Sequence, residues 1–182
     1  LLVGGVDELT DTSFDILSRF NLFKQPQGLS SEQLFSQGTT GTVAGEGSVF
    51  FTVSGTRNKH SYCRVEDIRT LSFGSTDDAL AVARRMLQQQ GLKASDVLLT
   101  GHNGDANHDQ QYDAFVQKLG HQGEVLKFKH LCGEYPTASS FALGLGATLL
   151  KPRPMQDATP CSVLFYNRSP QSHQSLVLLM AC

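Results

Sequence analysis

Apolar and polar residues alternate in blocks along the chain, and each block indicates a helix or a strand. The apolar run at residues 1–3 predicts the end of a buried strand that leads into a glycine turn. Residues 9–24 place large apolar side chains at helical spacing and predict a short helix. Residues 48–54 combine β-branched and aromatic side chains, which favours a strand. The Gly-, Ser-, Thr- and Gln-rich segment 25–47 between them predicts a loop.

The pattern becomes regular from residue 62 onward. Strands are predicted at 62–73, 96–101, 125–128, 162–166 and 175–180. Helices are predicted between a start signal at 74–78 and Gly91, over the apolar positions of 112–119, and over 138–150. Strands that alternate with helices of this size imply a mostly parallel sheet covered on both faces. We therefore predict an α/β fold around a mixed, mostly parallel five-stranded sheet.

Composition and charge narrow the class of protein. The 182 residues, 40% of them apolar and 18% charged, suffice for a core in one domain or two small ones. A net charge of -2 means that the chain has no excess of basic residues, so we expect no nucleic-acid partner. No run approaches the roughly 18 apolar residues of a membrane span, and the first residues lack the charged region of a signal peptide. These features predict a cytoplasmic protein without a membrane partner.

The cysteines and acidic residues do not predict a metal site. The chain has four cysteines, Cys63, Cys132, Cys161 and Cys182, which show no metal-binding spacing and no disulfide framework. We expect most of the four to be buried. Asp105, Asn107 and Asp109 occupy the first three ligand positions of a calcium loop. However, Gln110 stands where glycine is required and Val116 where glutamate is required. We interpret this segment as a solvated loop and helix start, and predict neither metal nor cofactor.

The segment 125–145 carries the strongest candidate site. An apolar strand ends near Lys129, and Glu134 precedes a helix that follows Pro136, at the kind of strand-to-helix turn where α/β proteins place their sites. Simpler roles are open for both residues: a strand-end lysine that extends to solvent, and a carboxylate that favours a helix N-terminus. Cys132 is either a reactive thiol or a buried apolar residue. His130 remains unassigned.

Three motifs, in this order, resemble the β-ketoacyl synthases of the thiolase superfamily. Residues 2–8, LVGGVDE, resemble a strand that ends in Gly-Gly-Ala-Glu. Residues 45–51, GEGSVFF, resemble a Gly-Glu-Gly turn that enters an apolar strand. Residues 99–104, LTGHNG, followed by Asp109, resemble a strand of the type Asn-Ala-His-Gly-Thr before an Asp-led helix. The resemblance extends over the whole chain.

This resemblance implies a thiolase-like layered α/β/α sandwich. Residues 1–60 would be the trailing part of an incomplete first core domain, and residues 61–182 would form the second core domain. In the family the nucleophilic cysteine lies upstream of the Gly-Gly strand, which places it before residue 1. Because the chain also starts directly in an apolar run without methionine, we expect it to be a fragment.

The resemblance also implies three site residues. His102 corresponds to the first of two family histidines, and Lys129 to the family lysine. Glu134 stands where the second histidine is expected, and a carboxylate offers a hydrogen only when it is protonated, which requires a raised pKa. The family glutamate further along is replaced by Leu143. We therefore expect Glu134 to be the charge partner of Lys129.

The function implied is that of a 3-oxoacyl-[acyl-carrier-protein] synthase-like acyltransferase of fatty acid or polyketide biosynthesis. Such enzymes condense acyl thioesters on acyl carrier protein with decarboxylation, and are homodimers or ketosynthase heterodimers. Without a nucleophile, this chain alone is not expected to condense. The closing loop at 166–173 lacks the family glycines, which favours a non-catalytic, chain-length-factor-like partner subunit as the alternative. An unrelated α/β small-molecule-binding domain is the third hypothesis.

Overall fold

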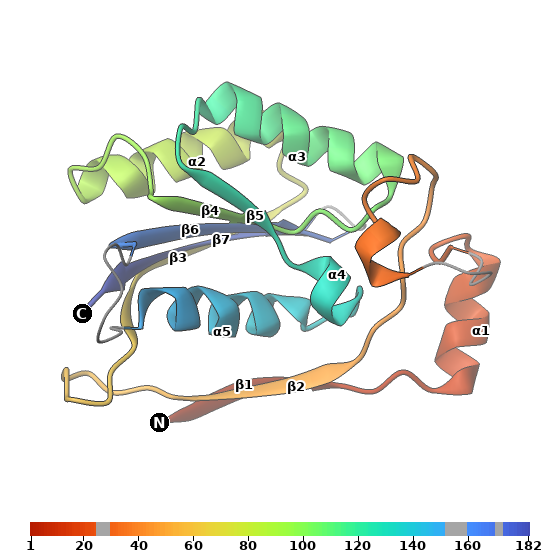
Figure 1. The fold of residues 1–182 in the computed structure, drawn as a ribbon, viewed down its shortest axis with the longest axis horizontal. Helices are drawn as coiled ribbons and strands as arrows, with labels where there is room; N and C mark the ends of the chain where they lie inside the picture. Colours follow the sequence, from red (N-terminus) through yellow and green to blue (C-terminus); the bar gives the residue numbers. More distant parts are fainter. Residues whose placement is uncertain (25–29, 152–159, 170–172) are drawn as a thin grey trace.

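Two β-sheets with a helix between them form the framework of the chain (Figure 1). The computed structural model describes residues 1–24, 30–151, 160–169 and 173–182. The strands are β1 (Leu2–Asp7), β2 (Gly47–Thr52), β3 (Cys63–Ser72), β4 (Val97–Thr100), β5 (Glu124–Lys127), β6 (Ser162–Arg168) and β7 (His173–Ala181). The helices are α1 (Asp11–Arg19), the 3-10 helix η1 (Ser31–Gln33), α2 (Thr76–Gln89), α3 (Ala106–Leu119), α4 (Lys129–Cys132) and α5 (Ala138–Leu150).

The larger sheet has five strands in the order β3-β7-β6-β4-β5. β4 pairs in parallel with both β5 and β6, whereas β7 is antiparallel to both of its neighbours. β7 is therefore the one strand of the five that runs against the others. Helices α2 and α3 cover one face of this sheet and α5 covers the other (Figure 1). The predicted mixed, mostly parallel five-stranded sheet is confirmed.

Side-chain caps mark the starts of α2 and α3, and a glycine marks the end of α3. Ser75 and Asp78 form a reciprocal capping box at the start of α2, which satisfies backbone N–H groups that lack partners within the helix. The Asp105 side chain accepts hydrogen bonds from two backbone N–H groups at the start of α3. Gly120, with φ of 69°, ends α3 in the left-handed conformation that glycine adopts without a steric cost.

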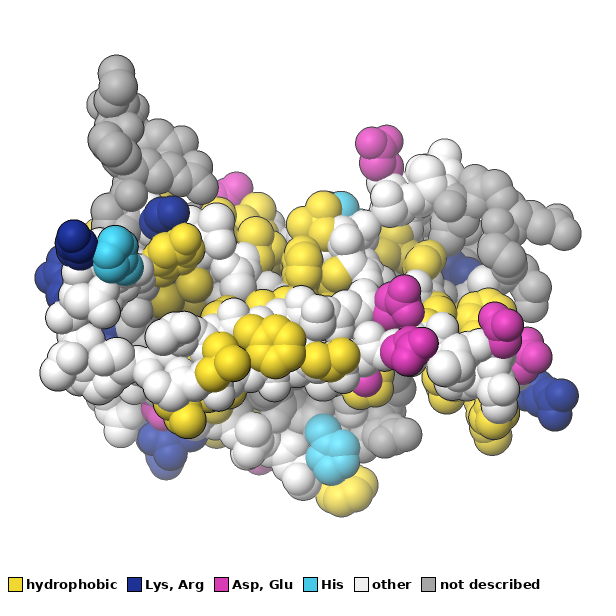
Figure 2. All heavy atoms as spheres, turned by 90° about the horizontal axis from the view of Figure 1, so that it is seen from below, with side chains coloured by type: hydrophobic (Ala, Val, Ile, Leu, Met, Phe, Trp, Pro, Cys, Tyr) yellow, Lys and Arg dark blue, Asp and Glu magenta, His cyan; other side chains and the backbone are white. Residues whose placement is uncertain are grey.

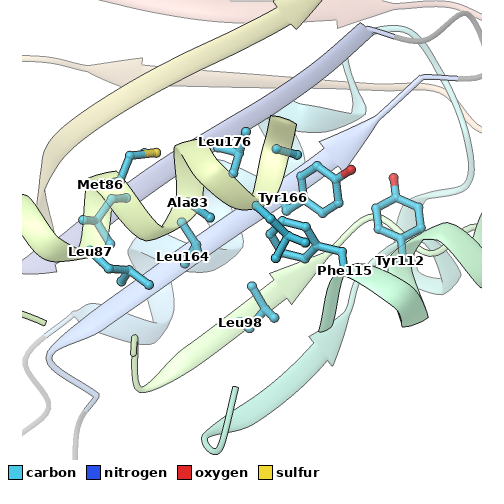
Figure 3. Packing of buried hydrophobic residues seen from close by; sticks show 12 residues of the cluster. Ala83, Met86, Leu87, Leu98, Tyr112, Phe115, Leu164, Tyr166 and Leu176 are labelled. Atoms are coloured by element: carbon cyan, nitrogen blue, oxygen red, sulfur yellow. The ribbon is translucent and has the colours of Figure 1, made fainter. Parts of the chain in front are cut away.

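Each face of the five-stranded sheet has its own apolar core. The α2–α3 side buries four apolar residues of α2, namely Leu80, Ala83, Met86 and Leu87. There they pack with residues of β4, β6 and α3, as Figure 3 shows for Leu98, Leu164 and Phe115. The second core lies on the α5 side and includes Phe128, Ala142 and Phe165. Such burial on both faces explains why β4 and β6 read as continuous apolar runs.

The smaller sheet is covered on one face only. β1 and β2 are antiparallel, and the inner side chains of β2, Val49 and Phe51, pack beside Gly144 of α5. The outer face exposes Leu2, Val6 and Phe50, and Figure 2 shows hydrophobic side chains in a row across it. The prediction of a buried strand at residues 1–3 was therefore wrong for this chain, because nothing among the described residues covers that face.

The stacking of the two sheets bears on the fold class. β2 belongs to the two-stranded sheet and β3 to the five-stranded sheet, and α5 lies between the two sheets (Figure 1). This is a layered arrangement and not one continuous sheet. It contradicts the hypothesis of an unrelated α/β small-molecule-binding domain, which does not predict two stacked sheets.

The cysteines are not buried as predicted: Cys161 is exposed, and Cys63, Cys132 and Cys182 are half-buried, because they lie at strand ends or in a short helix and not within a core. Pro152 and Pro154, the prolines that follow the helix predicted over 138–150, lie outside the described residues, as do residues 25–29 and residues 170–172 of the closing loop. No helix in the described part of the chain is long and apolar enough to cross a bilayer.

Candidate functional site

The candidate site lies at the carboxyl edge of the parallel strands. Strands β4, β5 and β6 all end at this edge, and helix α4 follows β5 after a single residue. Parallel α/β sheets bind ligands at this edge because loops from separate strands converge there. The short helix α4 was not predicted, since its four residues are too few for a periodic pattern. It places Lys129 at the start of a helical turn and not at a strand end.

Lys129 and Glu134 form a buried ion pair. The Lys129 Nζ lies 2.5 Å from the Glu134 Oε2, and the two side chains are 0% and 14% exposed. The turn between them passes through Gly133, with φ of 74°. A side chain there would collide with Gly45. Glu134 is further anchored by its backbone N–H, which donates to the Val43 carbonyl at 2.8 Å. The charge pairing expected from the sequence is therefore present.

Asn103 completes this cluster. Its Nδ2 donates to the Glu134 Oε2 at 2.8 Å, and its Oδ1 accepts the backbone N–H of Asp105 at 3.1 Å. The second bond sets the orientation of the amide, because only the oxygen can accept. The backbone of Asn103 is held by the Asp109 carboxylate at 2.9 Å and the Thr42 hydroxyl at 2.6 Å. Asn103 is thus a pre-positioned donor to Glu134.

His102 lies in a different environment. Its buried ring is 2.8 Å from the Thr100 Oγ1 through Nδ1 and 3.2 Å from the Asp113 Oδ1 through Nε2. The ring also stacks on Tyr112 at a centroid distance of 4.8 Å. Burial, and secondarily the positive charge of Lys127, lower the pKa of His102 below its usual 6.5. The ring is therefore a neutral member of a polar network inside the fold.

The three residues predicted from the sequence do not form one cluster. Lys129 and Glu134 are in direct contact, whereas no hydrogen bond joins His102 to either of them within the described residues. His102 and Asn103 both follow β4, which ends at Thr100, and their side chains contact different groups. The residue that reaches the ion pair is Asn103.

The acidic residues after β4 bind backbone groups. The Asp105 carboxylate accepts the N–H groups of Gly41, Asn107 and His108. These hydrogen bonds lower the pKa of Asp105, although burial acts in the opposite direction and is the largest single influence. Asp109 accepts two more backbone N–H groups, from Asn103 and Gly104. The carboxylates of Asp105 and Asp109 therefore hold the loop after β4 and cap the start of α3. This agrees with the predicted helix start.

A pocket adjoins the ion pair. It has a volume of about 210 Å³ and lies between residues 31–46 and helix α4, with Lys129 and Cys132 in its wall. Burial raises the pKa of the Cys132 thiol to about 11. The thiol is therefore protonated at neutral pH and is a poor nucleophile. The structure favours the apolar role for Cys132 over the reactive one.

Comparison with known proteins identifies the fold. No protein-family model and no curated protein matches the chain. Among solved structures, the ishigamide ketosynthase/chain length factor superposes with a TM-score of 0.74 at 15% identity, over 100% of this chain and 53% of its own. The PfaC keto synthase-chain length factor gives 0.71 at 14% identity, over 99% and 19%. The chain therefore has the thiolase-like fold of the ketosynthases.

A third structure with the ketosynthase-like fold includes a carrier protein. It is the type II polyketide synthase complex AntDE:AntF, an acyl-carrier protein with its ketosynthase bound to the hexaketide. The TM-score is 0.68 at 10% identity, over 100% of this chain and 51% of that one. The chain thus spans about half the length of two of these three structures and less of the other.

One signal in the sequence could have identified Asn103. In the ketosynthase pattern Asn-Ala-His-Gly-Thr, the histidine directly precedes a glycine. In this chain the residue directly before Gly104 is Asn103, and His102 lies one position earlier. Aligning on the glycine and not on the histidine would have pointed to Asn103.

Proposed function

We propose that the intact protein is a ketosynthase-like subunit of fatty acid or polyketide biosynthesis that does not itself condense. Like a chain length factor, it would pair with an active synthase and contact acyl chains carried by acyl carrier protein. The thiolase-like fold and the names of the superposing structures support this class of function. The proposal concerns the intact protein, because the chain covers only part of those structures.

The observation that carries the proposal is the direction of the donors in the site. Decarboxylating condensation needs N–H groups aimed at an oxygen that gains negative charge. Here the ammonium of Lys129 and the amide of Asn103 both donate to the carboxylate of Glu134. An ionised carboxylate only accepts hydrogen bonds. The donors are therefore directed to a side chain of the protein itself, and no histidine is hydrogen-bonded to this cluster within the described residues.

In this proposal the predicted site residues have supporting roles. Lys129 and Glu134 would hold the shape of the site, with Asn103 as their third member. His102 would stabilise the end of β4 through its network with Thr100 and Asp113. Condensation would take place on the partner synthase; the names of two superposing structures likewise state a ketosynthase together with a chain length factor.

The division of the chain is part of the same proposal. Residues 1–60 would be the last part of a first core domain and residues 61–182 a complete second one, in a cytoplasmic protein. The position of β1 and β2 in a separate sheet from β3–β7 supports this boundary, as does the coverage of about half of two ketosynthase structures.

A reconstitution assay tests the function. The full-length protein is incubated with acyl and malonyl carrier-protein thioesters, alone and with a synthase that copurifies with it, and carbon dioxide and 3-oxoacyl product are measured. We expect neither product from the protein alone and both in the presence of the partner. Condensation by the protein alone would contradict the proposal. It would mean that the protein is itself a condensing synthase.

A matched variant sharpens the assay. Substituting the asparagine and the glutamate by histidine (Asn103→His/Glu134→His) removes the carboxylate and places imidazole N–H groups at both positions. If misdirected donors are what prevents decarboxylation, this variant should release more carbon dioxide from malonyl thioester than the unsubstituted protein. An Asn103→His variant, which supplies one imidazole but keeps the Glu134 carboxylate as the acceptor of the donors, is the control and should not do so.

A further inference from the structure

Arg168 is a half-buried cation without an ionic partner among the described residues. It is the last residue of β6, at the same carboxyl edge as the ion pair. The salt bridges of the described residues do not include Arg168, and its Nε is buried without a hydrogen-bond partner there. A buried donor of a charged group that lacks an acceptor is unfavourable, because the hydrogen bonds that it makes to water in the unfolded chain are not replaced. The position therefore favours a ligand that supplies an acceptor.

The backbone of Arg168 is held in place from α3. The Tyr112 hydroxyl accepts the Arg168 backbone N–H at 2.8 Å and donates to the Asn167 Oδ1 at 3.1 Å. Asn167 in turn donates through Nδ2 to the Ser139 Oγ of α5 at 3.0 Å. Figure 3 shows Tyr112 and Tyr166 side by side at this end of the core. The end of β6 is thus tied to helices on both faces of the sheet, which gives Arg168 a fixed base.

A second buried nitrogen, on His108, also has no hydrogen-bond partner in the described part of the chain, and His108 is close enough to Arg168 for the charge of the guanidinium to act on it. His108 is one helical turn before Tyr112 on α3, so the two side chains share a helix face. The Nδ1 of His108 is buried and has no partner within the described residues. Burial lowers the pKa of His108, and the charged groups that act on it are Asp105, Arg168, Glu134 and Lys129.

The nearby carboxylates do not neutralise these two groups by direct contact. Asp105 and Asp109 accept backbone N–H groups. The Glu134 Oε2 is bonded to Lys129 and Asn103. None of the three is hydrogen-bonded to the side chain of His108 or Arg168 in the described part of the chain.

We propose that Arg168 and His108 form a binding site for an oxyanion group, a carboxylate or a phosphate, of a ligand that enters at the carboxyl edge of the sheet. The guanidinium would bind two oxygens of the group side by side, which suits its planar fork of donors. The imidazole would donate a third hydrogen bond from α3. This site is separate from the Lys129–Glu134 pair and does not depend on whether the protein condenses.

Calorimetric titration of the full-length protein with malonate and with inorganic phosphate tests the site. Binding of malonate alone would assign it to a carboxylate at the end of an acyl group, and binding of phosphate alone to a phosphate such as that of a carrier arm. We expect Arg168→Gln to weaken binding by about tenfold or more, the cost of a lost charge-assisted contact. Absence of binding by both probes would overturn the proposal.

Three further variants separate a specific site from a general charge effect. Arg69→Gln removes the same charge from an exposed arginine that is paired with Asp67, and should leave binding unchanged. Arg168→Lys keeps the charge but not the planar fork, and should still bind more weakly than the unsubstituted protein. His108→Gln should abolish a strengthening of binding toward low pH, because an anion raises the pKa of a nearby histidine. Equal losses for Arg69→Gln and Arg168→Gln would overturn the proposal.

Discussion

His102 and Asn103 are neighbours in the sequence and belong to two different polar clusters. The ring of His102 joins Thr100, Tyr112 and Asp113, in contact with the α3 side of the fold. The amide of Asn103 reaches Glu134 and, through it, Lys129 on the α4 side. Both residues follow β4, which ends at Thr100, yet His102 belongs to a structural network and Asn103 to the candidate site.

The difference shows that residue type alone does not locate a site. Histidine is the side chain most often associated with acid–base chemistry near neutral pH, yet the histidine of this strand end is buried and neutral. The cluster at the carboxyl edge consists of a lysine, a glutamate and an asparagine. Substitutions in the two clusters should therefore have different consequences.

The largest effect is expected from breaking the ion pair. Glu134→Ala leaves the ammonium of Lys129 buried without a carboxylate, and loss of one partner of a buried pair costs about 3–5 kcal/mol. We expect the free energy of unfolding, measured in urea, to fall by an amount of this order. A change below about 1 kcal/mol would mean that the ammonium finds solvent or another acceptor.

The control for this prediction removes both charges. Replacing the pair by apolar residues of similar size, Lys129→Met with Glu134→Leu, should cost much less than Glu134→Ala, because no unpaired charge remains. If the double variant is as unstable as the single one, the loss reflects packing and not the charge.

A smaller effect is expected for the His102 network. His102→Leu removes one partner each from Thr100 and Asp113, and should lower the free energy of unfolding by about 1–3 kcal/mol. We expect no loss of malonate binding at the Arg168–His108 site, since the Tyr112 hydroxyl, and not the His102 ring, holds the Arg168 backbone. Unfolding in urea and titration with malonate are the two measurements.

The pH dependence of folding stability tests the role of His102. Because the pKa of His102 is lowered by burial, the unfolded chain binds a proton at a higher pH than the folded chain does. The contribution of His102 to stability is therefore complete above its usual value of 6.5 and is lost as the pH falls below it. His102→Leu should reduce the slope of stability against pH in urea unfolding. A slope remains from His108 and His121, whose pKa values are lowered as well.

The smallest effect is expected for Asp113. Its side chain is 73% exposed, so Asp113→Asn should cost less than about 1 kcal/mol. Asp113 nevertheless raises the pKa of His102 through a hydrogen bond and its charge. The variant should therefore lower the pKa of His102 further, which an NMR titration of the ring would measure. An unchanged pKa would show that the contact at 3.2 Å is not maintained in solution.

Much of the fold could be predicted from local pattern. The five strands of the larger sheet and the helices α2, α3 and α5 follow from apolar spacing, caps and glycine stops. Pattern could not reveal α4, because four residues carry no helical period. It also could not reveal that β1 is exposed, since an apolar run looks the same whether or not a neighbouring layer covers it.

Less of the candidate site could be predicted. The pairing of Lys129 with Glu134 was expected from the resemblance to the β-ketoacyl synthases, and the structure places the two side chains in contact. Asn103 lies 31 positions from Glu134 in the sequence, so only the glycine that follows it indicated a role. Arg168 carried no such signal, and its lack of an ionic partner among the described residues is a property of the folded chain.

The sequence by itself determined the order of most helices and strands and the class of the fold, and its resemblance to a known family implied the pairing of Lys129 with Glu134. The order of the elements is a local property, because periodicity, capping and short turns act over a few residues. Only the tertiary structure decided which groups the side chains of His102 and Asn103 contact and which charges lack a partner among the described residues. Those properties depend on contacts between β4, β6, α3 and α4, which a local pattern does not record.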